Sequence, residues 1–154
     1  MPELLWPAAL SLLLVVGAIG DILKRRLPNW LSLALLVTGL AFAFANGGIE
    51  AIGWHGAHAA IALAVGMALF AGGIIGGGDA KFYAGAAAWF PLSDGLSLLL
   101  SVSLAGLAAI IIWFGSRRVF KPGAIDPDSL YAKFPYGVAI AGGGLWLLWS
   151  ALPA

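Results

Sequence analysis

Long apolar segments that carry almost no charge make up most of this chain, and they constrain its fold more than any other feature. Only 10% of the residues are charged, against about a quarter in a soluble domain. A helix needs roughly 20 mostly apolar residues to span a membrane. By this measure the spans lie at about 4–22, 30–45, 57–75, 79–91, 95–115 and 136–152. We therefore predict an all-α, polytopic membrane helix bundle of about six transmembrane helices, and the short segment 79–91 leaves a count of about five open.

The basic residues all fall on one side of this six-span topology. They are Lys24, Arg25, Arg26, Lys81, Arg117, Arg118, Lys121 and Lys133. The other side receives Glu3, Glu50 and Asp94, with no lysine or arginine. Because Lys and Arg concentrate in cytoplasmic loops, we expect the basic side to be cytoplasmic and both chain termini to lie outside, in the periplasm. The segregation also favours six spans, since removing one crossing would mix the charges.

Two aspartates lie at the ends of predicted spans on the cytoplasmic side. Asp21 ends the first span, in GDILKRRLPNWLS, and Asp79 begins the fourth, in GGIIGGGDAKFYAG. The topology puts both at a similar depth, so they could meet inside the bundle. Two carboxylates at close range share a proton, one acting as acid and the other as base, and such a pair can activate water against a peptide carbonyl. The alternatives are a helix N-cap for Asp79 and an ion pair with a neighbouring base for Asp21.

Other hydrolytic chemistry finds little support in the sequence. The absence of cysteine excludes a thiol nucleophile and Cys-ligated zinc. His55 and His58 fall in the predicted outer loop beside Trp54, far from the aspartates. We interpret them as interfacial residues, with half a metal site as the alternative. We expect no metal, no cofactor and no nucleic-acid partner.

Glycines and a Pro-Asn pair accompany the two aspartates. Gly76 and Gly78 let the backbone approach another chain closely, so an extended peptide could lie beside Asp79. Close packing between membrane helices is the alternative use of such glycines. After the first aspartate, Pro28 ends its segment and Asn29 is expected to cap the next helix.

The motifs around these residues resemble those of the type IV prepilin peptidases. GDILKRRLPNWLS is similar to that family's first-aspartate motif with its Pro-Asn pair, and GGGDAKFYAG to its Gly-x-Gly-Asp motif with a trailing lysine. FPYGVAIAGG, residues 134–143, resembles the Pro-Tyr-Gly segment that opens the family's last span. The resemblance implies that Asp21 and Asp79 are the catalytic residues. The supporting residues that it implies are Gly76, Gly78, Lys81, Pro28, Asn29, Pro135, Tyr136 and Gly137.

The resemblance covers nearly the whole chain and implies a single membrane-embedded prepilin peptidase domain over residues 1–154. Its members are metal-independent aspartic endopeptidases of the bacterial inner (plasma) membrane. They cleave the basic leader peptide from prepilins and pseudopilins, the pilin-like secretion subunits, at the cytoplasmic face. Contacts with membrane lipids follow from this location.

Larger members of the family carry a cysteine-containing cytoplasmic region and also methylate the new N-terminus. This chain has no cysteine and looks like the short, peptidase-only members of Flp-type, tight-adherence pilus systems. Methyltransferase activity is therefore not expected. Asp126 and Asp128, in the hydrophilic loop 116–135, are interpreted as a solvated turn, with contact to the basic leader as the alternative.

Two other functions fit parts of this pattern. A presenilin-like intramembrane protease also uses Gly-x-Gly-Asp, but the Pro-Asn pair and the shallow cytoplasmic position of the aspartates favour a prepilin peptidase. A small proton-coupled transporter also uses intramembrane acids and broken helices. Such a transporter would be expected to carry acids along a path between the two faces, whereas here they gather near one face.

Overall fold

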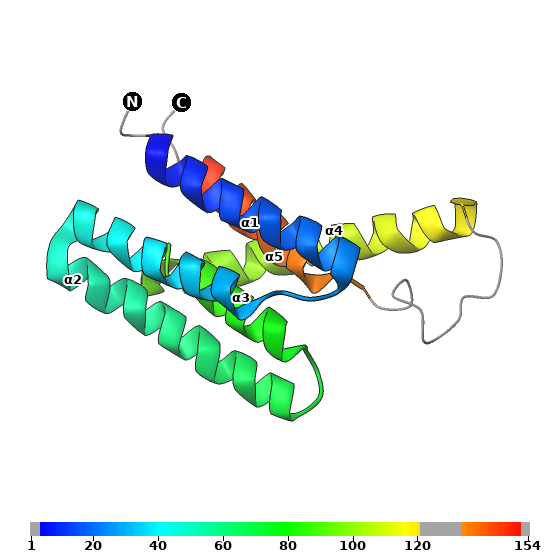
Figure 1. The fold of residues 1–154 in the computed structure, drawn as a ribbon, viewed down its shortest axis with the longest axis horizontal. Coiled ribbons are helices and arrows are strands. Elements are labelled where there is room, and N and C mark those ends of the chain that lie inside the picture. Colours follow the sequence, from blue (N-terminus) through cyan, green and yellow to red (C-terminus); the bar gives the residue numbers. More distant parts are fainter. Residues whose placement is uncertain (1–3, 121–133, 152–154) are drawn as a thin grey trace.

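The described part of the chain is entirely helical. A computed structural model describes residues 4–120 and 134–151, and these residues form no strand (Figure 1). The helices are α1 (Leu5–Lys24), α2 (Asn29–Ala71), α3 (Gly77–Ala87), the short 3-10 helix η2 (Leu92–Asp94), α4 (Gly95–Phe120) and α5 (Tyr136–Ser150). The prediction of an all-α fold is confirmed for these residues.

A single glycine turns α2 back on itself. Gly48 has φ 65° and ψ −152°, which lies outside the helical region. Glycine adopts this conformation more readily than any other residue. The helical segments on either side of it fold back as antiparallel arms (Figure 1). Phe42 on the first arm packs edge-on against His55 on the second, with ring centroids 6.2 Å apart. The structure therefore replaces the loop predicted between residues 45 and 57 with helix that is broken at Gly48.

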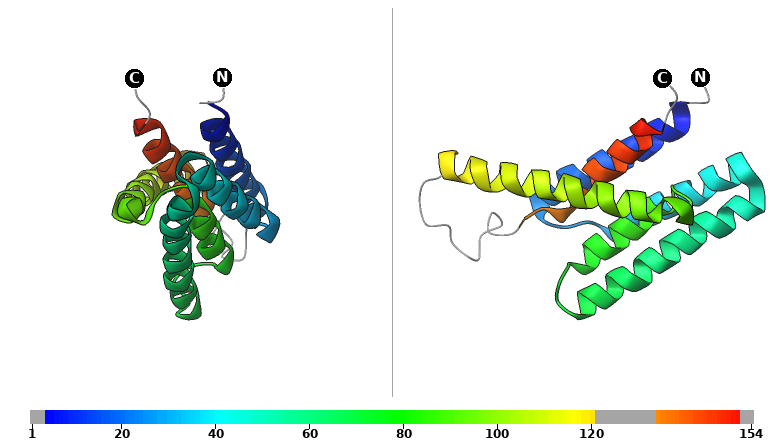
Figure 2. Two further views of the ribbon diagram at one scale, coloured as in Figure 1. Left: turned by 90° about the vertical axis from the view of Figure 1, so that its left-hand side faces the viewer. Right: turned by 180° about the vertical axis from the view of Figure 1, so that it is seen from behind.

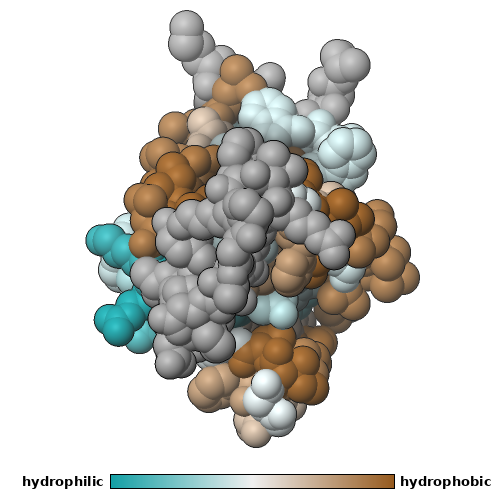
Figure 3. All heavy atoms as spheres, turned by 90° about the vertical axis from the view of Figure 1, so that its right-hand side faces the viewer, coloured by the Kyte–Doolittle hydropathy of each residue, from teal (hydrophilic) through white to brown (hydrophobic). Residues whose placement is uncertain are grey.

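The helices have the length and surface of a membrane protein. Three segments of the described chain are long and apolar enough to span a membrane: Leu5–Lys24, Asn29–Ala71 and Leu92–Ser116. Large apolar side chains also cover outward faces, as at Leu12, Leu104 and Ile112, which are 65%, 67% and 70% exposed. Figure 3 shows broad apolar areas of the described surface at one end of the molecule. Such surfaces favour contact with lipid, while the count of six spans stays a prediction.

The helices pack as two groups that meet around α3. α2 and α3 pack against each other, and α4 and α1 both pack on α5 (Figure 2). The groups touch where α1 meets α2 and where α3 meets α5. α3 is buried between them, and its Phe82 is fully enclosed. Gly17 of α1 makes room for this side chain, because a Cβ at position 17 would overlap the Phe82 ring.

This contact predicts a stability effect. Gly17→Ala forces α1 or Phe82 to move, and overpacking of a close-packed core typically costs about 1–3 kcal/mol. We expect a lower midpoint of thermal unfolding in detergent solution. Gly53→Ala is the matched control, since a Cβ at position 53 meets nothing within 4 Å. An equal midpoint for the two variants would show that the Gly17–Phe82 contact does not limit stability.

Candidate functional site

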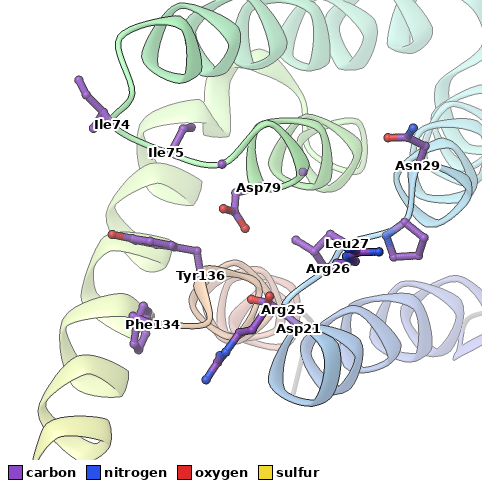
Figure 4. Close-up of a pocket in the computed structure, with 13 residues that line it drawn as sticks. Asp21, Arg25, Arg26, Leu27, Asn29, Ile74, Ile75, Asp79, Phe134 and Tyr136 are labelled. Carbon is purple, nitrogen blue, oxygen red and sulfur yellow. The ribbon is translucent and has the colours of Figure 1, made fainter. Parts of the chain in front are cut away.

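A cavity of about 750 Å³ lies where the two groups of helices meet (Figure 4). It is bounded by the last turn of α1, the connection to α2, the segment before α3 and the start of α5. The cavity is at the opposite end of the bundle from the start of α1 and the end of α5 (Figure 1). The predicted site residues that line it are Asp21, Pro28, Asn29, Gly76, Gly78, Asp79 and Tyr136.

Asp21 is held in place by the backbone of α5. It lies in the last turn of α1 and is only 6% exposed. Its Oδ2 accepts a hydrogen bond of 2.7 Å from the backbone N–H of Gly137. That N–H belongs to the first turn of α5, where backbone donors have no partner within the helix. A Cβ at position 137 would lie 3.0 Å from both Cβ and Oδ2 of Asp21, so glycine permits this close approach.

Asp79 is held by the backbone of its own helix. It lies in the first turn of α3, three residues after the N-cap Gly76, and its carboxylate accepts a hydrogen bond from the Gly76 backbone. An acidic residue that reaches back to the N-cap N–H in this way satisfies a donor that the helix leaves unpaired. A Cβ at position 76 would lie 2.6 Å from Oδ2 of Asp79, so this position also favours glycine. Asp79 is therefore not itself the N-cap of α3.

The two carboxylates face the same cavity from different groups of helices. Asp79 points from α3 toward the side of the cavity that is formed by Asp21 and the last turn of α1 (Figure 4). They are close enough to interact electrostatically. Two ionised carboxylates repel each other, and this repulsion is relieved when the pair shares one proton. The arrangement can therefore supply one acid and one base to a molecule bound in the cavity.

A hydrogen bond between Lys81 and Asn29 links the helix that contains Asp79 to the helix that follows Asp21. The Nζ of Lys81 donates a hydrogen bond of 3.1 Å to Oδ1 of Asn29, which joins α3 to the start of α2. The expectation that Asn29 caps α2 is wrong, because Pro28 occupies the N-cap position and Asn29 is the first helical residue. Its side chain is thus free to accept from Lys81. Gly78 lies against Leu27 of the same connection, where a Cβ would be 3.5 Å from the Leu27 Cβ.

The Pro-Tyr-Gly segment opens α5 beside the cavity. Pro135 is the N-cap of α5 and does not line the cavity. Tyr136 does line it and is 45% exposed. Its ring packs edge-on against Phe134, with centroids 5.4 Å apart. The segment therefore supplies an aromatic wall to the cavity and, through Gly137, an anchor to Asp21.

Arg25 also lines the cavity, and it is one of the neighbouring basic residues that the sequence offers as a partner for Asp21. It is the C-cap of α1, with φ 50° in the left-handed region, and its N–H donates to the Asp21 carbonyl oxygen at 2.9 Å. Its guanidinium lies 4.8 Å from the centroid of the Trp113 ring of α4 and also interacts electrostatically with the Asp21 carboxylate. The spacing of four residues between Asp21 and Arg25 suits such an interaction along one helix face.

His55 and His58 are buried structural residues, and the prediction that they lie in an outer loop is wrong. Both are on the second arm of α2 and are 7% and 4% exposed. Their Nδ1 atoms lie 2.9 Å from the carbonyl oxygens of Ala88 and Phe90, to which they donate. These carbonyls follow the end of α3, where backbone acceptors lack helical partners. Within residues 4–120 and 134–151, no group of three or more His, Asp or Glu residues could hold a metal ion.

Asp126 and Asp128 lie outside the described residues.

Comparison with known proteins gives one match. Residues 8–113 match the family model of the type IV leader peptidases. This range contains both aspartates and the glycines before Asp79, and it ends ahead of α5. No curated protein and no solved structure matches the chain significantly.

Proposed function

Because the chain belongs to the type IV leader peptidase family, we propose that it is an aspartic endopeptidase in which Asp21 and Asp79 activate water. The observation that carries this proposal is the shared cavity: two carboxylates from distant parts of the chain line it together. Each is fixed by a backbone hydrogen bond next to a glycine. A pair that served only to cap helices would not need to line one cavity.

The proposed reaction needs only the two carboxyl groups and one water molecule. The ionised carboxylate takes a proton from water while the water oxygen attacks the peptide carbonyl, and the protonated carboxyl group gives its proton to the carbonyl oxygen. In the tetrahedral intermediate the first group returns its proton to the leaving nitrogen and the second takes a proton from a hydroxyl. The C–N bond then breaks, and the pair again holds one proton.

The proposed substrate is a Flp-like prepilin, cleaved after its basic leader at the cytoplasmic face of the inner membrane. The charge distribution supports this orientation, since Lys24, Arg25, Arg26 and Lys81 gather at the end of the bundle that holds the cavity. Positive residues favour the cytoplasmic side. Six spans, counting the two arms of α2 separately, would leave both termini outside.

A single assay separates this function from its alternatives. Purified protein is incubated in detergent with a candidate Flp-like prepilin, and the products are identified by mass spectrometry. We expect one cut, which releases the basic leader. A cut within the apolar helix of the substrate would favour a presenilin-like protease instead. The absence of any cleavage across several candidate prepilins would count against the peptidase and leave the proton-coupled transporter as the better explanation.

Chelators provide a second prediction. Cleavage is expected to be unchanged in EDTA, because the carboxyl pair supplies both the acid and the base that the reaction needs. The measurement is the rate of leader release before and after dialysis against EDTA. Loss of activity that is restored by added zinc would contradict the metal-independent mechanism.

A further inference from the structure

A second cavity adjoins the one that holds the aspartates. It has a volume of about 450 Å³ and lies between the second arm of α2, α3, α4 and α5. Ile75, Asp79 and Tyr136 line both cavities, so the second begins at the catalytic carboxylate. Its far end is formed by His58 and Gly95. We refer to this second cavity as the apolar groove.

The lining of the groove suits contact with an apolar helix. Ala62, Ala80 and Ala139 are buried along it, and small residues of this kind let another helix approach closely in a membrane. Val65 of α2 and Leu99 of α4 also line it, and they are 55% and 52% exposed. Groove residues on both walls therefore remain available to an apolar partner.

The shape of the bundle leaves the groove open beside Asp79. α4 runs at an angle to α2 and α3 and diverges from them toward the end at which α3 begins (Figure 2). α3, which runs beside the groove, has 11 residues. At 1.5 Å per residue it is about 16 Å long, or about three turns of a second helix placed alongside it.

We propose that the groove receives an apolar, helical segment of the substrate that lies directly after the scissile bond, with that bond held at Asp79. The inference rests on the proposed peptidase function. The groove is continuous with the catalytic cavity. A substrate segment that lies in the groove must therefore be close in sequence to the bond that is cleaved. A basic leader would lose its hydration in this apolar lining at high cost, so it occupies the other side of the bond. An apolar segment at membrane depth must be helical to satisfy its own backbone.

Cysteine crosslinking tests this placement, because the chain contains no cysteine of its own. Leu99 and Leu100 are neighbours on α4 with nearly equal exposure, 52% and 54%, and of the two only Leu99 lines the groove. Leu99→Cys and Leu100→Cys are each made in the Asp21→Asn background, which prevents turnover. The prepilin carries one cysteine, moved in turn through about 11 residues after the scissile bond. Disulfide formation is measured in membranes.

We expect crosslinking of Leu99→Cys at one or two helically spaced substrate positions and much weaker crosslinking of Leu100→Cys. Equal crosslinking at both positions would mean that the substrate helix lies against α4 without using the groove. Crosslinking at neither, with a prepilin that the wild-type protein cleaves, would also overturn the proposal. Failure of the wild-type protein to cleave that prepilin counts against the peptidase function. Preferential crosslinking of Leu99→Cys would then still support the groove, and its absence would count against both proposals.

Kinetics give an independent check. Leu99→Trp narrows the groove without touching the aspartates, and we expect KM for a full prepilin to rise by about tenfold while kcat changes little. Leu100→Trp is the matched control and should keep the wild-type KM. Equal KM values for the two variants would exclude the groove as the binding surface.

Discussion

Asparagine in place of either Asp21 or Asp79 is expected to reduce prepilin cleavage by about 10²–10⁴-fold, which is the range of general acid–base catalysis. Asparagine has nearly the same size as aspartate, and its amide oxygen can still accept the hydrogen bonds from Gly137 and Gly76 that hold the two carboxylates. The amide can neither take nor give the proton that the reaction needs. The measurement is the initial rate of leader release by purified variants at equal concentration.

Two further variants test whether the loss of activity comes from the carboxyl pair. Asp94→Asn removes a carboxylate at the opposite end of the bundle, beside a cavity lined by Trp6 and Ala151, and should keep full activity. The double variant of Asp21 and Asp79 should lose about as much cleavage activity as either single variant, because the effects of residues that act as a unit do not add. Substantial activity in either single variant would rule out the carboxyl pair.

The sequence predicted which segments meet better than it predicted the contacts between them. Complete segregation of the basic residues sets the side of the membrane on which each span ends, and from this topology Asp21 and Asp79 were expected near one face. Tyr136 was expected beside them only from the family resemblance. The structure places all three along one cavity. The hydrogen bond from Gly137 to Asp21 depends on how closely α5 packs on α1. No local pattern encodes that distance, so the bond could not be predicted.

The region around Gly48 shows where local signals mislead. Asn46-Gly47-Gly48 is a turn signal, and the chain does reverse there. The turn signal does not show that the chain is helical immediately before and after the turn. The helical second arm depends on its packing against α3. Because His55 was therefore assigned to a loop, its bond to the Ala88 carbonyl was missed. That bond depends on tertiary contact and has no counterpart in the hydrophobic pattern.

Gly137→Ala is expected to lower kcat by about 10²-fold, which is the cost of displacing a catalytic group by about 1 Å. The added methyl group would lie 3.0 Å from Cβ and Oδ2 of Asp21, and both atoms belong to a side chain that is only 6% exposed. Either α5 or the carboxylate must shift, and the 2.7 Å hydrogen bond from the Gly137 N–H is then lengthened. The aspartate pair keeps both carboxyl groups, so the loss comes from their position.

Gly142→Ala separates this effect from a general disturbance of α5. A Cβ at position 142 would meet the Ala105 Cβ at 3.4 Å, which is ordinary van der Waals contact. Both variants change one glycine of the same helix to alanine, and Gly142→Ala should keep wild-type kcat. Equal midpoints of thermal unfolding for the two variants would show that the helix still packs. A Gly137→Ala protein with wild-type kcat would mean that the contact between α5 and Asp21 does not position the carboxylate, and the anchor would then have to lie within α1 itself.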